Sequence, residues 1–154
     1  MAWRLYTDPK GRFVCKVPPG WTIREERQDP RSKVSFSCSD GEIGIITRDT
    51  GRHILDESDR NEYVGVMQGV MRKAQQMGQQ ARLIGVEWAS IGEVKALKAE
   101  TEFIKPERFR ATQMKFKRDG WDHCITLTVK SFDQQKNYEL LFDEFLREYK
   151  NPPR

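Results

Sequence analysis

The chain has 154 residues, of which 37% are hydrophobic and 32% charged, with 8 Phe, 4 Tyr, 4 Trp and a formal net charge of +4. Its length is typical of one domain, and its aromatic content can support a core, so the composition excludes a disordered chain. We therefore expect one soluble domain over residues 1–154. No apolar run approaches the ~20 residues that cross a bilayer, so a membrane span is not expected.

Extended segments dominate the first part of the chain. Residues 13–17 alternate between apolar and polar side chains up to a Pro-Pro-Gly turn, and a second strand begins at Trp21. A third strand at 34–38 and a fourth at 42–47 are separated by an Asp-Gly step, which favours a hairpin. Gly44, inside the fourth strand, indicates a bulge or close packing.

The apolar spacing then changes to three and four residues, which predicts an amphipathic helix near 58–77. Carboxylates crowd its first turn and Gly78 follows its last apolar position, as helix ends prefer. The face expected to pack on a sheet consists of Tyr63, Val66, Met67, Val70, Met71, Ala74 and Met77. The methionines allow an alternative, an adaptable groove for a partner, but a helix that docks on a sheet needs such a face, which favours the core.

Four further extended segments with short turns predict an antiparallel meander, and a second helix closes the chain. The segments are 82–90, 95–104, 109–118 and 121–131, and the helix is 133–150. The core-facing strand residues are expected to be Leu97, Ala99, Thr101, Phe103, Thr112, Met114, Phe116, Ile125, Leu127 and Val129. The apolar face of the second helix holds Tyr138, Leu141, Phe142, Phe145, Leu146 and Tyr149. This order of strands and helices along the chain predicts an α+β fold with one antiparallel sheet of seven or eight strands and two long amphipathic helices packed on it. Four of the strands are expected to precede the first helix.

The aromatic start, the two-helix layout and the run Gly-Arg-Phe-Val-Cys-Lys-Val-Pro-Pro-Gly-Trp at residues 11–21 resemble the PsbP-like superfamily. That superfamily groups photosystem II extrinsic proteins, a Ran-binding nuclear import factor and small bacterial proteins, among them chaperones for secreted effectors. The resemblance implies an α/β/α sandwich around an antiparallel sheet, and a binding or assembly role in place of catalysis. It assigns no functional residue here.

Catalytic and metal motifs do not occur in the chain, which has no H-E-x-x-H, G-x-S-x-G, phosphate loop or EF-hand pattern. Of the two histidines, His53 is expected at the surface. His123 is expected to be a hydrogen-bonded histidine at the core margin, not a metal ligand. The cysteines, Cys15, Cys38 and Cys124, are odd in number and contain no C-x-x-C pair, so reduced structural thiols are expected. No catalytic residue, metal or cofactor is expected.

One segment, 105–118, is strongly basic and is the candidate for contacting phosphates or an acidic protein. Its candidate binding residues are Arg108, Arg110, Lys115, Lys117 and Arg118. Strand alternation directs the arginines to one side and the two lysines to the other, which favours a solvated hairpin over a single binding patch.

Three functions follow as hypotheses. The leading one is a non-enzymatic protein-binding or assembly module with an unidentified protein partner. The alternatives are a small-ligand carrier or enzyme with a pocket between the sheet and the C-terminal helix, and a weak polyanion binder, although a net charge of +4 does not favour nucleic acid. We expect a cytoplasmic location if the chain is complete, and an extracytoplasmic one if a signal segment was removed.

Overall fold

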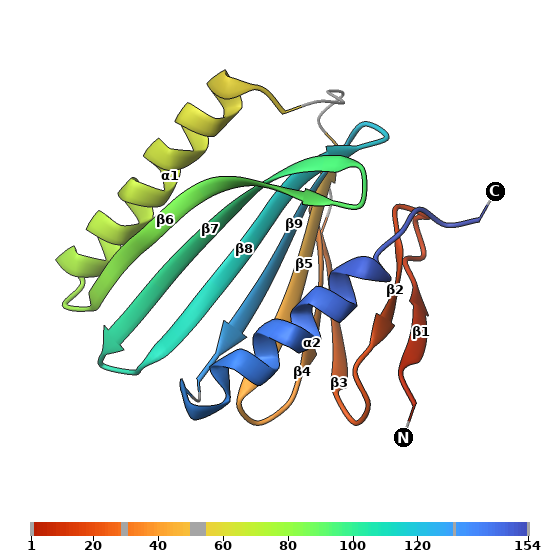
Figure 1. Cartoon of the computed structure of the whole chain (residues 1–154), viewed down its shortest axis with the longest axis horizontal. Helices are drawn as coiled ribbons and strands as arrows, with labels where there is room; N and C mark the ends of the chain where they lie inside the picture. The colour runs from red at the N-terminus through yellow and green to blue at the C-terminus, as the bar shows by residue number, and fades with distance from the viewer. Residues whose placement is uncertain (1, 29–30, 50–54, 131, 154) are drawn as a thin grey trace.

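The structure of the protein is a computed structural model that describes residues 2–28, 31–49, 55–130 and 132–153. It is a mixed α+β fold built on a seven-stranded antiparallel sheet with the order β3-β4-β5-β9-β8-β7-β6 (Figure 1). The strands of this sheet are β3 (Thr22–Gln28), β4 (Arg31–Ser37), β5 (Gly41–Asp49), β6 (Gln80–Ile91), β7 (Val94–Lys105), β8 (Phe109–Arg118) and β9 (Trp121–Val129). The helices are α1 (Glu57–Gln76), the 3-10 turn η1 (Phe132–Gln134) and α2 (Gln135–Arg147).

The predicted strand at 13–17 does not join the large sheet. It is β2 (Val14–Val17), which pairs with β1 (Arg4–Thr7) in a separate two-stranded sheet and bridges Lys150 on its other side. Five strands therefore precede α1, and the prediction of four was wrong. The sequence signal for β1 is weak because it is short and its apolar Leu5 is exposed.

The predicted hairpins are present, but the close-packed glycine is not Gly44. The pairing of β5 with β4 and β9 runs through Gly44 without a bulge, and a Cβ there would meet no atom nearer than 3.9 Å. A Cβ on Gly41 would lie 2.6 Å from the Tyr138 ring. The close approach predicted for Gly44 occurs instead where the strand begins, under α2.

Separate cores lie on the two faces of the sheet, because adjacent strand residues point to opposite faces. The larger core joins α2 and β2 to alternate strand residues. It contains Phe142 and Phe145 of α2 and the strand residues Phe36, Ile43, Met114, Phe116, Ile125, Leu127 and Val129. Two smaller ones join α1 to Leu97 and Ala99 of β7 and to Ala81 of β6. The core-facing residues predicted from the strands thus divide between the two helices.

Both helices form close to the predicted ranges. Asp56 caps α1, accepting a hydrogen bond from the Asp59 amide at 2.9 Å and donating its own amide to the Asp59 carboxylate, and Gly78 (φ 84°) follows the helix end. The second helix is shorter than predicted, yet Tyr149 beyond its end is still buried, since Lys150 pairs with Val14. No helix within the described ranges is long and apolar enough to cross a membrane.

The predicted burial of the first helix is only half correct. Tyr63, Met67, Met71 and Ala74 are buried, whereas the exposed fractions of Val66, Val70 and Met77 are 56%, 46% and 73%. The helix packs at the β6 edge of the sheet (Figure 1), so the sheet covers only one side of its apolar stripe.

Candidate functional site

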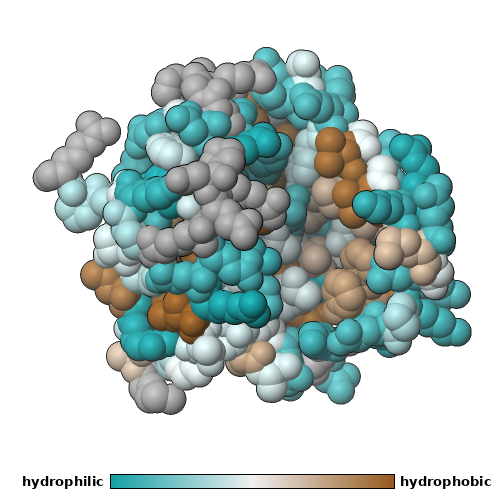
Figure 2. All heavy atoms as spheres, turned by 180° about the vertical axis from the view of Figure 1, so that it is seen from behind, coloured by the Kyte–Doolittle hydropathy of each residue, from teal (hydrophilic) through white to brown (hydrophobic). Residues whose placement is uncertain are grey.

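A groove of about 520 Å³ lies between α1 and strands β5, β8 and β9. The wall formed by α1 presents Val66, Met67 and Val70, and the floor includes residues from all three strands. The floor residues are Ile46, Arg48, Leu97 of β7, Gln113, Lys115, Lys117, Asp122 and Cys124. Figure 2 shows hydrophobic surface gathered in a hollow bordered by hydrophilic residues on the face turned away from α2.

The groove exists because the sheet is wider than the helix that covers it. α1 packs on β6, and the described sheet continues through β8, β9 and β5. On this face those strands present short or polar side chains, including Thr126, Cys124 and Gly44, which leave space above the sheet. We define this hollow, lined by α1, β5, β8 and β9, as the α1 groove.

Hydrogen bonds connect the wall of the α1 groove to its floor. The Tyr63 hydroxyl donates to Gln113 Oε1, and Gln113 Nε2 donates to Thr126 Oγ1 at 3.3 Å. Burial raises the pKa of Tyr63, so its hydroxyl remains a proton donor at neutral pH. This chain of contacts holds α1 at a set distance from β8 and β9.

The charged side chains of the α1 groove are a floor group joined by ion pairs, one further lysine, and two acidic residues of α1, Asp59 and Glu62. Lys117 forms a buried ion pair with Asp122, and Arg48 Nη2 lies 3.5 Å from Asp122 Oδ2. Lys115 Nζ lies 5.3 Å from the centroid of the Tyr63 ring. Among the residues that the structure describes, Lys115 forms no ion pair. Lys115 therefore supplies a positive charge on the groove floor that no ion pair within the described residues compensates.

The five basic candidates do not form one surface. As strand alternation predicts, Lys115 and Lys117 face the α1 groove, while the Arg118 guanidinium lies over the Tyr149 ring at 5.3 Å on the other face. Arg108 and Arg110 lie near Glu102, whose pKa is lowered chiefly by its hydrogen bond from Arg82 and further by both arginines. The predicted solvated hairpin was wrong for Lys117, which is buried in its ion pair with Asp122. The candidates offer no joint patch for a polyanion.

Comparisons with known proteins identify the fold. No family model and no curated protein matches the sequence. Among solved structures, the cyanobacterial PsbP protein of Synechocystis superposes with a TM-score of 0.73 at 16% identity, covering 98% of this chain and 93% of its own. The chain has the PsbP-like fold.

Two other structures share the PsbP-like fold at lower similarity. The Ran-binding protein Mog1p of Saccharomyces cerevisiae gives a TM-score of 0.58 at 14% identity, with 98% of this chain and 96% of its own covered. A Pseudomonas aeruginosa protein of unknown function, described as a putative regulator, gives 0.51 at 11% identity over the full length of both chains. These identities establish the fold alone.

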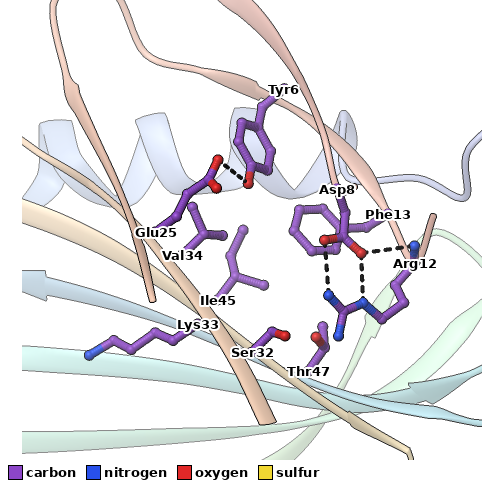
Figure 3. Close-up of a pocket in the computed structure, with 10 residues that line it drawn as sticks. All are labelled: Tyr6, Asp8, Arg12, Phe13, Glu25, Ser32, Lys33, Val34, Ile45 and Thr47. Atoms are coloured by element: carbon purple, nitrogen blue, oxygen red, sulfur yellow. Dashed lines mark hydrogen bonds and ion pairs between the residues drawn. The ribbon is translucent and has the colours of Figure 1, made fainter. Parts of the chain in front are cut away.

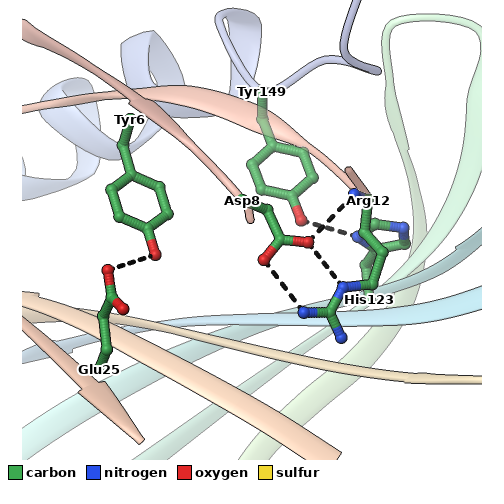
Figure 4. Close-up of polar contacts among 6 residues, drawn as sticks. All are labelled: Tyr6, Asp8, Arg12, Glu25, His123 and Tyr149. Carbon is green, nitrogen blue, oxygen red and sulfur yellow. Dashed lines mark hydrogen bonds and ion pairs between the residues drawn. The ribbon is translucent and has the colours of Figure 1, made fainter. Parts of the chain in front are cut away.

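The sequence predicted His123 at the margin of the core, whereas the structure places it in the interior of the PsbP-like fold. It is 1% exposed, stacks on Phe116 with ring centroids 4.8 Å apart, and its Nδ1 lies 2.7 Å from the Tyr149 hydroxyl (Figure 4). Burial, aided by the charges of Arg118 and Arg12, lowers the pKa of His123 to about 3, so the ring is neutral. The hydrogen-bonded histidine predicted from the sequence is confirmed.

Neither metal ligands nor thiols form a second site in the part of the chain that the structure describes. Within the described residues, no group of three or more His, Cys, Asp or Glu side chains could hold a metal ion. Cys15, Cys38 and Cys124 form no disulfide, and burial raises the pKa of Cys15 to about 12, which keeps it protonated. The predicted surface position of His53 lies outside the described residues.

Two smaller hollows accompany the α1 groove. One lies beside the buried pair Asp8 and Arg12 (Figure 3) and, at about 10 Å³, has room for roughly one water molecule. The other, of about 310 Å³, lies between α2 and strands β6 to β9, with Lys98, Glu100 and Asp143 in its lining. It occupies the place where the sequence-based alternative put a ligand pocket.

Sequence reasoning favoured the core for Val66 and Val70 over its alternative, an adaptable groove for a partner, and so did not predict the groove wall. One signal was available in the glycines at 65 and 69, each of which precedes one of these valines. Glycine inside a helix costs roughly 0.5–1 kcal/mol relative to alanine. A Cβ on Gly65 would meet no atom within 4 Å, so packing within the chain does not require that glycine.

Proposed function

We propose that the protein is a non-enzymatic binding module and that its partner is another protein, bound in the α1 groove. The observation that carries this proposal is the half-exposed pair Val66 and Val70, which faces a hollow of about 520 Å³. A contiguous apolar surface rimmed by polar groups is typical of interaction sites, because water solvates it poorly.

The chemistry of the α1 groove supports binding over catalysis. Lys117, Asp122 and Arg48 compensate one another, and the Tyr63 hydroxyl is held protonated by burial, so none of these four side chains is poised as a base or nucleophile. One protein with the same fold, Mog1p, is described as Ran-binding, which is consistent with protein recognition by this fold.

Photo-crosslinking from inside the groove tests the proposal. A photoreactive residue at Val70 should crosslink a discrete partner in the native cell, because this side chain lies at the expected interface. The matched control carries the same residue at Gln68, which is exposed on the same helix and does not line the groove. Crosslinks that are absent, or that occur equally from both positions, would contradict a protein partner in this groove.

A small-ligand carrier is the second candidate, favoured by the hollow of about 310 Å³ between α2 and the sheet. Its volume is at the lower end of the ~300–1,000 Å³ usual for ligand pockets. A compound that binds there must raise the melting temperature, and Thr112→Phe, which adds bulk to the lining, should abolish that rise. A ligand screen without any such shift removes this candidate.

We also propose that residues 1–154 act as a single domain arranged as an α/β/α sandwich. The support is that α1 and α2 pack against strand residues of opposite alternation, Leu97 and Ala99 for α1, and Phe116 and Ile125 for α2. Separate unfolding of two parts of the chain in calorimetry would contradict the single domain.

A further inference from the structure

We propose, building on the function above, that the segment seated in the α1 groove is an amphipathic α-helix of the partner protein, with an aliphatic stripe bordered by a carboxylate that pairs with Lys115. Three features of the groove lead to this partner: the strands that form its floor, the shape of its wall and the position of its uncompensated charges.

The floor excludes an extended segment that would bind by strand pairing. β8, β9 and β5 are inner strands, each hydrogen-bonded to neighbours on both sides, and they present only side chains to the groove. A segment lying on them finds no backbone groups to pair with. Because backbone groups shielded from water need hydrogen-bond partners, a segment that satisfies its own backbone, a helix, suits this floor.

The wall has the dimensions and the surface that a second helix requires. From Asp59 to Val70 it runs roughly 16 Å along the axis of α1, about three turns. Val66, Gly69 and Val70 share this flank of α1 by their spacing of three and four residues. A Cβ on Gly69 would meet no atom nearer than the Arg72 guanidinium at 4.0 Å, so the absent side chain leaves room for the backbone of a neighbouring helix.

The uncompensated charges specify the borders of the docking helix. Lys115 lies on the floor, where its ammonium is 5.3 Å from the centroid of the Tyr63 ring, and Glu62 lies on the α1 rim, exposed. In the described part of the chain neither residue takes part in an ion pair. A partner helix with an acidic residue toward the floor and a basic residue toward α1 would pair both, and its aliphatic residues would cover Val66 and Val70.

Two designed peptides test this partner directly. Both are amphipathic helices of ~18 residues, about five turns, with the same leucine and alanine stripe, and they differ only in whether glutamate or lysine borders the stripe on the floor side. Fluorescence anisotropy should show that the glutamate peptide binds at least about tenfold tighter. Lys115→Gln should remove that preference, while Lys136→Gln, an equal charge change on the exposed side of α2, should preserve it.

Steric variants separate docking in the groove from general attraction to a basic protein. Val66→Arg should abolish binding of the glutamate peptide, whereas Gln68→Arg should leave it unchanged, and both exposed substitutions should leave the melting temperature near that of the wild type. The proposal is overturned if neither peptide binds, if both bind equally, or if Lys115→Gln and Lys136→Gln act alike. A groove-specific crosslink obtained together with any of these results would retain the binding function and reject only the helical, carboxylate-bearing partner.

Discussion

The Nδ1 atom of His123 lies 2.7 Å from the phenolic oxygen of Tyr149, and this contact joins β9 to the segment that follows α2 (Figure 4). Both side chains are buried among Phe116 and the stacked Phe13 ring. Burial lowers the pKa of His123 to about 3 and raises that of Tyr149, so the contact joins two uncharged groups. Protonation of the imidazole is therefore coupled to unfolding.

The first prediction is a loss of stability in mild acid. The pKa of His123 is about 3 in the folded protein and about 6.5 when unfolded, so the unfolded chain binds the proton first. The contribution of neutral His123 to the free energy of unfolding is complete above pH 6.5. Between pH 6.5 and pH 3 the free energy of unfolding falls by up to roughly 1.4 kcal/mol per pH unit. Urea unfolding between pH 7 and about 5.5 measures the slope, before the carboxylates of Glu102 and Asp8 contribute, whose ordinary pKa values are 4.5 and 3.8 and whose pKa is lowered in the fold.

A variant identifies the source of that pH dependence. His123→Phe keeps an aromatic ring against Phe116 but leaves the buried Tyr149 hydroxyl without its partner, so the variant should be less stable at pH 7. Because phenylalanine cannot be protonated, the stability of the variant should depend much less on pH. Equal slopes for the wild type and His123→Phe would mean that other groups control the acid response.

The second prediction concerns the buried ion pair of Asp8 and Arg12. Arg12 Nε lies 2.6 Å and Nη2 3.0 Å from the two carboxylate oxygens, and both side chains are almost fully buried (Figure 4). Burial raises the pKa of Asp8, but the hydrogen bonds from Arg12 outweigh it and leave that pKa lowered. Asp8→Ala should cost about 3–5 kcal/mol, because it leaves an uncompensated buried guanidinium.

A double-mutant cycle checks the origin of this cost. Asp8→Ala, Arg12→Met and the double variant are compared by urea unfolding, and the double variant should lose clearly less than the two single losses together. Strict additivity would show that the two side chains act independently.

The third prediction contrasts two strand glycines. Gly41→Ala should destabilise the protein by about 1–3 kcal/mol, since its Cβ would lie 2.6 Å from the Tyr138 ring and force that ring to move. Gly44→Ala, whose Cβ would meet nothing nearer than 3.9 Å, should be neutral or slightly stabilising. Thermal unfolding of both variants decides the matter, and equal effects would contradict the close approach of Gly41 to Tyr138.

The fourth prediction concerns the core of α2. Phe145 is completely buried and contacts the Phe36 and Tyr149 rings, so Phe145→Ala should cost about 3–5 kcal/mol. Leu140→Ala on the same helix is the control, because Leu140 is largely exposed and should change stability by less than about 0.5 kcal/mol. A similarly small loss for Phe145→Ala, measured by urea unfolding, would remove this residue from the core.

Elements defined by neighbouring residues were predictable from the sequence. The start of α1 depends on a capping box formed within residues 56–59, and its end on Gly78. The β8–β9 hairpin depends on Asp119 and Gly120, both with positive φ. Each of these features is satisfied by groups a few positions apart, so the local sequence determined them. The short strand β1 was missed because only its pairing with β2 makes it a strand.

The functional surface was decided by the tertiary structure. Val66 and Val70 have the same helical spacing as the buried Tyr63 and Met67, and periodicity cannot tell which side of a wide apolar stripe a sheet will cover. Lys117 is buried because the β8–β9 register places it opposite Asp122, a pairing that polarity alone does not reveal. The sequence by itself determined which segments are helical or extended, whereas the groove exists only because α1 packs at the β6 edge of a seven-stranded sheet and leaves β8, β9 and β5 uncovered beside it.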